Sequence, residues 1–408
     1  MITCFDIAVV GGGPAGAAAA AMLARGGLRV VLFEQKLFPR QKVCGEFVST
    51  GARPVLNRLE ILQAFDAMAG PPLRRMVAFP AAGHALECGL PADGGGNFPR
   101  ALSRDRFDQL ILTAARDSGV EVIQPAHVEG IQRAKDHGLS LTLHNATQYH
   151  AKVIVVADGK PVGRQPPIGV PAAELRGGRD DSRPPPPSGF LGFKAHFSNC
   201  DLPDDVTVIA GAGGIYAGLL RTSDAIEPCD APGGAPTKTY NVAFAAHQSL
   251  LERFRGADDL LNYLLAENRG LWRIMRRGIR KGKWYSCGPM RPGVRRLYHE
   301  GCFHAGNSAG EVHALIGEGM TLALRSARLL ADQLITGVAR GLTPAAIGPM
   351  YEQAWHQEFT SRLDAGNLFS NLLMRPILGS LAADALNTFP EILNAAVGYS
   401  GKSANRVA

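Results

Sequence analysis

The feature that most constrains the fold of this chain is a glycine-rich turn near its start, between a short apolar run and a helix-favouring stretch. Residues 5–10 form the apolar run, the turn is Gly11-Gly12-Gly13-Pro14-Ala15-Gly16, and residues 15–25 favour a helix. A second apolar run, 29–33, ends in Glu34. This order predicts a strand, a turn, a helix and a parallel strand, which together begin a βαβ unit.

The residue types in the turn indicate a binding site as well as a fold. Gly11 permits the tight turn, Gly13 lets the backbone approach a pyrophosphate, and Gly16 lets the helix pack closely against the strand. Pro14 and Ala15 begin the helix whose amides would face the phosphates. Glu34 can accept hydrogen bonds from ribose hydroxyls and would repel a 2′-phosphate, so the site suits FAD or NAD rather than NADP.

Composition excludes several other classes of protein. With 408 residues, 46% of them apolar and 19% charged, the chain is neither disordered nor fibrous, and it is long enough for two or three lobes. Its seven cysteines include no C-x-x-C pair, so we expect neither a disulfide framework nor a metal site. We find no secretory leader and no spanning apolar stretch, and therefore expect a cytoplasmic protein.

The remaining sequence predicts a second lobe and a helical end. Ser103 is a candidate cap for a helix to about residue 117, and strands are expected near 120–123, 139–143 and 152–156. After a Pro- and Gly-rich loop at 166–188, an antiparallel sheet is predicted from four segments: 190–197, 206–210, 215–220 and 240–244. A second such loop spans 228–236. Later elements are expected as a helix at 250–275, a strand at 302–305, a helix at 319–334 and a mostly helical last part.

Five motifs, in order along the first 335 residues or so, give the chain a family resemblance. They are the glycine turn with Glu34, the segment 39–46 (PRQKVCGE), the segment 103–108 (SRDRFD), Ala157-Asp158-Gly159, and the segments 306–310 (GNSAG) and 317–320 (GEGM). Together they resemble the FAD-dependent oxidoreductases of the p-hydroxybenzoate hydroxylase superfamily, particularly the geranylgeranyl reductase-like branch. Five ordered matches are more specific than a glycine turn alone.

The resemblance implies a fold, a division into lobes and a cofactor. The fold class is α/β (α+β overall), with a Rossmann-like three-layer FAD-binding lobe from discontinuous segments, an antiparallel β-sheet substrate lobe and a helical C-terminal region. The FAD-binding lobe would comprise 1–50, 96–165 and 285–337, the substrate lobe 51–95 and 166–284, and the helical region 338–408. Besides the glycine turn and Glu34, the residues expected to hold FAD are Arg40, Arg104, Asp158, Gly159, Asn307, Gly319 and Met320. The amides of the last two would begin a long helix and face the flavin edge.

Two departures from the family pattern bear on the reaction. Asn307 replaces the usual Asp that meets the ribityl hydroxyls, and its amide can still hydrogen-bond a hydroxyl. Ala314 replaces a Pro beside the flavin ring, which bears on oxygen activation. The W-x-W-x-I-P stretch of tryptophan-type halogenases is absent from the sequence, which disfavours halogenation.

Three residues are candidates for catalysis, each with a structural alternative. By the family resemblance, Cys44 would face the flavin and the substrate; the alternative is that it packs as a small apolar residue. Glu46 would either transfer a proton or accept hydrogen bonds within a turn. His313 would donate a proton near the ring or serve the fold. His196 and Lys194 share one strand face, which would line the substrate chamber or, as the favoured interpretation, be solvated.

Two further segments concern partners. Much of the net charge of +7 lies between Arg273 and Arg296, which we interpret as a solvated face, with an acidic partner such as a carrier protein, a substrate phosphate or NADPH as alternatives. Nucleic acid is disfavoured because no aromatic-interleaved module accompanies the charge. The apolar segment 368–378 would pack in the core, or form a lid or a peripheral membrane contact.

The sequence thus predicts a flavoenzyme of secondary metabolism. The leading hypothesis is a monooxygenase that takes electrons from NAD(P)H and hydroxylates a lipophilic aromatic or polyketide-like small molecule, free or bound to a carrier protein. Reduction of a C=C bond in an isoprenoid or polyene is the second hypothesis. A non-catalytic flavin-binding partner of a biosynthetic complex, altered at Asn307 and Ala314, is the third.

Overall fold

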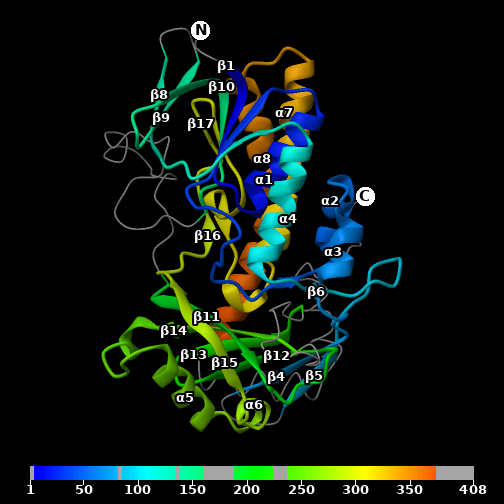
Figure 1. The fold of residues 1–408 in the computed structure, drawn as a ribbon, viewed down its shortest axis with the longest axis vertical. Helices are drawn as coiled ribbons and strands as arrows, with labels where there is room; N and C mark the ends of the chain where they lie inside the picture. Colours follow the sequence, from blue (N-terminus) through cyan, green and yellow to red (C-terminus); the bar gives the residue numbers. More distant parts are fainter. Residues whose placement is uncertain (1–3, 81–84, 135–137, 160–187, 224–236, 374–408) are drawn as a thin grey trace, which may run out of the picture.

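Two β-sheets, one above the other along the longest axis of the molecule, organise the chain (Figure 1). The computed structural model describes residues 4–80, 85–134, 138–159, 188–223 and 237–373. The path of the first sheet runs β17 (Tyr298–His299), β18 (Cys302–His304), β10 (Gln148–Val156), β1 (Cys4–Val10), β2 (Val30–Phe33) and β7 (Glu121–Ile123). Neighbouring strands along this path are parallel, and the exception is the antiparallel pair of β17 and β18. The predicted parallel arrangement around the glycine turn is confirmed.

Helices cover one face of this sheet and a hairpin covers the other. The helices are α1 (Pro14–Arg25), α4 (Arg104–Asp117), α7 (Gly319–Ala339) and α8 (Pro344–Leu373), which share one apolar core with the sheet (Figure 1). On the opposite face, β8 (Val128–Arg133) and β9 (Leu139–Leu143) pack over Phe5, Ala8 and Phe33. These layers are the three-layer lobe that the sequence predicts.

The second sheet is antiparallel except for one parallel pair. Its order is β15 (Ile279–Cys287), β11 (Phe190–Ser198), β14 (Tyr240–His247), β13 (Ile215–Arg221), β12 (Val206–Ala212), β4 (Arg75–Phe79) and β5 (Leu86–Gly89). The parallel pair is β12 and β4. Helices α5 (Ala257–Glu267) and α6 (Arg269–Met275) bury Leu260, Leu264 and Leu271 against the sheet. The predicted fold class is confirmed, whereas the exact lobe boundaries stay a prediction.

Short elements join the two sheets. β3 (Phe47–Val48) pairs with β6 (Arg100–Ala101), and β16 (Gly293–Val294) pairs with β19 (Gly310–Glu311). The 3₁₀ turn η1 (Thr50–Ala52) leads into α2 (Arg53–Arg58) and α3 (Leu62–Met68), which contribute Val55, Leu56 and Phe65 to the core of the first lobe. The chain therefore crosses between the lobes several times.

Some local expectations were wrong. The single helix expected at 250–275 is α5 and α6, because Asn268 interrupts it and its side chain accepts the Leu271 amide hydrogen bond at 3.0 Å. Strand β15 lies where only a basic cluster was recognised. Ser103 occupies the N-cap position of α4 without a side-chain capping bond. The segments 166–187, 228–236 and 374–378 lie outside the described residues.

Among the residues that the structure describes, no helix combines the length and apolarity needed to cross a bilayer. The described part of α8 instead packs by its aromatic side chains. Tyr351, Trp355 and Phe359 are buried in the core of the first lobe.

Candidate cofactor and active site

The glycine turn has the geometry that its sequence predicts. Gly11 has φ +103°, and a Cβ there would lie 2.4 Å from the Ala157 carbonyl oxygen. A Cβ on Gly16 would lie 1.9 Å from the Gly11 carbonyl oxygen, so helix and strand touch here. At Gly13, by contrast, the nearest atom to a Cβ is Arg40 Nη2 at 3.9 Å. The turn is therefore closed toward the sheet and open at Gly13.

The N-terminus of α1 lies in this opening. The helix begins at Pro14 directly after Gly13, and no side chain caps its first amides. These N–H groups carry the positive end of the helix dipole and have no partner within the helix. An open turn with uncapped amides fits the pyrophosphate of FAD.

Glu34 lies at the end of β2, beside the turn. Its carboxylate is buried and accepts hydrogen bonds from the Gly12 amide at 2.7 Å and the Lys36 amide at 2.9 Å. Arg40 Nε lies 3.6 Å from Glu34 Oε1. The carboxylate is thus fixed next to Gly12, where the predicted bond to a ribose hydroxyl requires it.

Two arginines bind Asp108, and a lysine of the same segment lies near Gly159. The Arg104 guanidinium donates two hydrogen bonds of 2.7 Å to the Asp108 carboxylate, and Arg40 donates one of 3.1 Å. Lys42 Nζ would lie 2.9 Å from a Cβ on Gly159, at the end of β10. Burial, with the nearby Arg104 and Arg40 charges, lowers the pKa of Lys42 to about 8. This positive surrounding suits an anionic cofactor.

A second loop, at 306–308, lies beside the end of β10. Ser308 Oγ donates to Asp158 Oδ1 at 2.6 Å and accepts the Gly159 amide hydrogen bond at 3.1 Å. Arg295 donates to the Asn307 carbonyl oxygen, which fixes the backbone at that residue. A Cβ on Gly306 would lie 2.7 Å from Ala15 Cβ, so this loop packs against the start of α1.

The start of α7 completes the predicted cofactor motifs. Gly317 has the left-handed φ of +74°, and Gly319 and Met320 begin the helix. Glu318, at the N-cap position, accepts a hydrogen bond of 2.9 Å from Ser49 Oγ. The predicted helix N-terminus is therefore present after a glycine turn.

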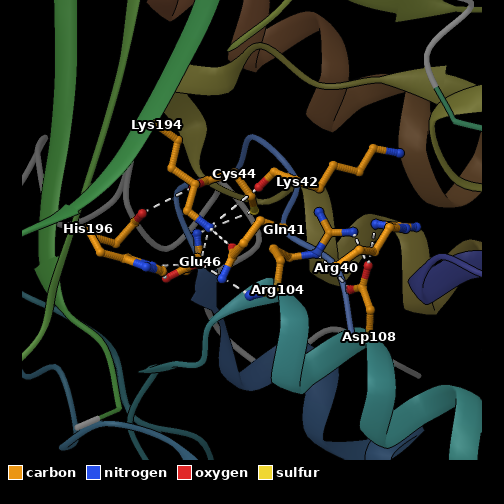
Figure 2. Close-up of polar contacts among 10 residues, drawn as sticks. Arg40, Gln41, Lys42, Cys44, Glu46, Arg104, Asp108, Lys194 and His196 are labelled. Carbon is orange, nitrogen blue, oxygen red and sulfur yellow. Dashed lines mark hydrogen bonds and ion pairs between the residues drawn. The ribbon is translucent and has the colours of Figure 1, made fainter. Parts of the chain in front are cut away.

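A buried carboxylate links the 39–46 segment to the second sheet (Figure 2). Glu46 is fully buried, with φ +61°, and forms an ion pair with the fully buried Lys194 of β11. His196 Nε2 lies 3.0 Å from Glu46 Oε2. The same carboxylate accepts the Arg104 amide hydrogen bond at 3.2 Å, so Glu46, and not Ser103, caps α4.

The charge state of Glu46 fixes the proton on His196. Burial alone would raise the pKa of Glu46, but the Lys194 charge and the His196 hydrogen bond outweigh it and lower the pKa to about 2. An ionised carboxylate only accepts hydrogen bonds, so His196 Nε2 carries the hydrogen and Nδ1 is left to take or give a proton. The ionised Glu46 carboxylate therefore accepts hydrogen bonds and orients His196.

The sheet face with Lys194 and His196 is not solvated, which corrects the favoured interpretation. Lys194 also donates to Gln41 Oε1 at 2.6 Å, and the His196 side chain is only 19% exposed. A Cβ on Gly192, two residues before Lys194, would lie 3.1 Å from Cys287 Sγ and 3.3 Å from Val43 Cγ1, so the space beside this glycine is tight. The 39–46 segment thus packs directly on β11.

Gln41 is a residue of this cluster that the sequence reasoning missed, and Lys194 was recognised only as a neighbour of His196 on a strand face. The available signal was a charged residue and a histidine at alternate positions in the otherwise apolar Phe190–Phe197 stretch. Alternate residues share one face of a strand. The partner carboxylate, 148 residues earlier in the chain, was visible only in the structure.

Cys44 lies at the edge of this cluster and is half-buried. Its thiol contacts the Arg104 guanidinium, and its sulfur accepts the Glu46 amide hydrogen bond at 3.3 Å. Asn241 Nδ2 donates to the Cys44 carbonyl oxygen at 3.1 Å. Asn241 Oδ1 is buried and has no hydrogen-bond partner among the described residues. The structure thus brings Cys44 and Glu46 together.

His313 has a different environment from the Glu46 cluster. It is buried, its Nδ1 accepts the Leu315 amide hydrogen bond at 3.4 Å, and its ring lies 5.4 Å from that of Tyr216. Burial lowers the pKa of His313 to about 4. The imidazole is therefore neutral at pH 7, and this geometry supports a structural role better than that of a proton donor.

The basic segment 273–296 divides into two parts. Arg295 turns inward, where it pairs with Glu311 at 2.8 Å and binds Asn307. The residues from Arg273 to Lys283 lie on α6 and β15, with their cationic side chains exposed. In the described part of the chain, no cluster of three His, Cys, Asp or Glu side chains could hold a metal ion.

Comparison with known proteins agrees with this geometry. The FAD binding domain family matches residues 5–173, which contain the glycine turn, Glu34, Arg104 and the end of β10. The match supports the resemblance to the FAD-dependent oxidoreductase superfamily and assigns an FAD binding domain to these residues.

Relatives of this flavoprotein include named reductases. It is 31% identical to menaquinone reductase of Mycobacterium tuberculosis (strain CDC 1551 / Oshkosh) over 163 residues, which are 39% of each chain. It is 23% identical to digeranylgeranylglycerophospholipid reductase 2 of Methanopyrus kandleri, over 96% of this chain and 90% of that protein. Conditioned medium factor receptor 1 of Dictyostelium discoideum is 23% identical over 98% of this chain and 74% of that protein.

Solved structures share the fold. The flavin-dependent brominase Bmp2 matches with a TM-score of 0.74 and 19% identity, over 98% of this chain and 94% of that chain. PqsL, a probable FAD-dependent monooxygenase from Pseudomonas aeruginosa, matches with a TM-score of 0.69 and 15% identity, over 94% of this chain and 100% of that chain. At these identities the likeness concerns the architecture, and it leaves open which flavin reaction this chain performs.

Proposed function

We propose that this flavoprotein is a monooxygenase that hydroxylates a lipophilic aromatic or polyketide-like small molecule, with NAD(P)H as the electron donor. The observation that carries the proposal is the position of His196. It is oriented by a buried, ionised carboxylate in the segment that follows the cofactor cradle. A hydroxylated aromatic substrate becomes electron-rich when it loses its phenolic proton, and such a histidine can accept that proton.

The cofactor would be held by the elements already described. Gly13 and the start of α1 would face the pyrophosphate, Glu34 the ribose, and Asn307 with the start of α7 the rest of the molecule. When bound, FAD supplies the redox chemistry and the reaction with oxygen. The protein supplies position, charge and proton transfer.

Each residue of the Glu46 cluster would have a distinct task. His196 Nδ1 would take a proton from a substrate hydroxyl and later return it, while Nε2–H stays bonded to Glu46. Lys194 offsets the carboxylate charge, so Glu46 orients the ring without requiring the imidazolium form. Glu46 and Lys194 are then positioning residues, because a side chain with no exposed surface reaches no substrate.

Reduction of a C=C bond is a second candidate, supported by two observations. The relatives that are named reductases include one that aligns over 96% of this chain. The half-buried Cys44 thiol lies against the Arg104 guanidinium, and both Cys44 and His196 contact Glu46, so two groups could deliver the proton that alkene reduction needs. The identity of that donor separates this candidate from the first.

Oxygen use by the purified protein distinguishes the two candidates. The protein is checked for bound FAD, reduced by NADH or NADPH under nitrogen, and mixed with oxygenated buffer. Rapid reoxidation, with hydrogen peroxide released when no substrate is present, supports the monooxygenase. Slow reoxidation by oxygen together with fast turnover by a one-electron donor supports the reductase and contradicts our proposal. A protein that cannot be loaded with FAD contradicts both.

Variants at the two departures from the family pattern test for loss of catalysis. Asn307→Asp and Ala314→Pro restore the usual residues. If the double variant gains activity many-fold over an inactive parent, the chain is a non-catalytic flavin-binding protein. Unchanged activity in N307D/A314P supports an active enzyme, and His196→Asn, which keeps the FAD site intact, should then lower turnover while FAD stays bound.

A further inference from the structure

One end of the molecule carries an exposed surface that the flavin chemistry does not explain. Helix α6 lies at the end opposite the first sheet, and the start of β15 follows it after a short turn (Figure 1). Among the described strands, β15 lies at the edge of its sheet and is bonded only to β11. We call the exposed residues of α6, the turn and the first half of β15 the α6–β15 surface.

The α6–β15 surface is rich in cations without counter-charges. Six of its basic side chains are exposed and form no ion pair with any carboxylate of the described residues: Arg269, Arg273, Arg276, Arg277, Lys281 and Lys283. A seventh, Arg280, pairs with Asp258 at 3.3 Å. Unpaired cations at this density repel one another, so an anionic partner would relieve the repulsion.

Two large apolar side chains lie among these cations. Trp272 on α6 is 47% exposed, and Ile279 at the start of β15 is 58% exposed. The Arg276 guanidinium lies 5.8 Å from the Trp272 ring centre, so cation and aromatic ring are neighbours. A solvated basic face needs neither an exposed tryptophan nor an exposed isoleucine.

We infer that the α6–β15 surface docks on an anionic lipid bilayer. Arginine and lysine are attracted to an anionic membrane surface, and tryptophan favours the headgroup region. A protruding end with apolar side chains ringed by cations presents both to a flat bilayer at once. The carboxylates of an acidic protein partner would neutralise the cations but would not cover the apolar side chains. Such a partner would also need a groove for Trp272 and Ile279.

This contact has a different place in the molecule from the one expected from the sequence. From the sequence, the apolar segment 368–378 is expected to pack in the core, with a lid or a membrane contact as the alternatives. The basic cluster is interpreted there as a solvated face, with an acidic partner, a substrate phosphate or NADPH as alternatives. The new assignment rests on exposure and charge alone and does not depend on the flavin reaction. It would bring the enzyme to the phase in which a lipophilic substrate dissolves.

Vesicle flotation of the purified, FAD-loaded protein tests the inference. The probes are vesicles of phosphatidylcholine alone and of phosphatidylcholine with about one third phosphatidylglycerol. We expect binding to the mixed vesicles only, weakened by salt. The variant R273E/R276E should bind at least tenfold more weakly, whereas the control R116E/R340E, with the same net charge but changed in the first lobe, should bind like the parent.

A second pair of measurements reports on the apolar side chains. Trp272→Ala with Ile279→Ser should weaken vesicle binding at every salt concentration, and its thermal unfolding checks that the fold is kept. Bromine-labelled lipid should quench tryptophan emission in the parent but not in Trp272→Phe. Equal vesicle binding by R273E/R276E and R116E/R340E would overturn the inference, as would no binding to anionic vesicles. Retention of an acidic carrier protein in place of vesicles would replace the lipid by a protein partner.

Discussion

Glu46 and Lys194 form an ion pair with no exposed surface on either side chain, between the cofactor segment of the first lobe and strand β11 of the second sheet (Figure 2). The Glu46 carboxylate also receives the Arg104 amide and the His196 imidazole. One side chain thus joins the 39–46 segment, the start of α4 and the second sheet. This ion pair is therefore one of the contacts that join the first lobe to the second sheet.

Lys194→Met removes one partner of the pair and leaves a buried carboxylate without its counter-charge. We expect a loss of about 3–5 kcal/mol in the free energy of unfolding, measured by chemical denaturation. The double variant E46Q/K194M should recover part of this loss, because both charges are then absent. Lys283→Met, at an exposed site, is the control and should change stability by less than about 0.5 kcal/mol. Equal losses in the single and double variants would show that packing, and not charge, makes the difference.

Stability should fall in two stages as pH decreases. Burial lowers the pKa of His304 and of His313 to about 4, so the unfolded chain takes up protons first and stability declines from about pH 6.5 to pH 4. Below about pH 4.5 the protonation of Glu46 adds to the loss, because its folded pKa of about 2 lies below the unfolded value. Each fully buried group contributes at most about 1.4 kcal/mol per pH unit.

His313→Asn separates the first stage from the second. Melting temperatures between pH 7 and pH 4 should fall less steeply in the variant than in the parent, because one neutral buried histidine is absent. The control His144→Asn acts in the opposite direction, since Glu129 raises the pKa of His144 and its stabilisation is present below that pKa. A steeper acid loss in H313N would contradict the assigned charge state.

Two glycines of the same turn should respond differently to a methyl group. Gly16→Ala places a Cβ 1.9 Å from the Gly11 carbonyl oxygen, and we expect a loss of at least about 3 kcal/mol in folding stability. Gly13→Ala meets only Arg40 Nη2 at 3.9 Å, so the fold should persist while the methyl group occupies the space for the pyrophosphate. FAD affinity, measured by fluorescence titration, should drop about tenfold or more in G13A at unchanged melting temperature of the cofactor-free protein. Unchanged FAD affinity in G13A would remove the turn from the cofactor site.

The sequence could predict what depends on neighbours along the chain. The glycine turn, the strands around it and the helix from Gly319 follow from local patterns, and the structure confirms them. Strand β15 could not be recognised because Arg280, Lys281 and Lys283 on an exposed edge give no apolar alternation. The cap of α4 was misassigned because a distant carboxylate, Glu46, replaces the adjacent Ser103.

The candidate site likewise has features that follow from local sequence and features that depend on distant residues. Glu46 and His196 were each recognised as chemically capable, but their roles depend on a contact between residues 150 positions apart. A sequence pattern gives no charge state for a carboxylate, which here is determined by Lys194 on another sheet. Motif reasoning therefore names candidate cofactor residues, which stay a prediction, whereas the contact between Glu46 and His196 is visible only in the structure.

Lys42 should make FAD binding depend on pH in the mildly alkaline range. Burial, with Arg104 and Arg40 nearby, lowers its pKa to about 8, and an anionic cofactor would favour the protonated form. FAD affinity should therefore be highest below pH 8 and decline as pH rises through that value, because deprotonated Lys42 offers no charge. Lys42→Met should bind FAD more weakly at pH 7 and lose this pH dependence, whereas the exposed Lys36→Met should retain it. Titrations of both variants from pH 6.5 to pH 9.5 check this, and an equal decline in K42M and the parent would assign the dependence to another group.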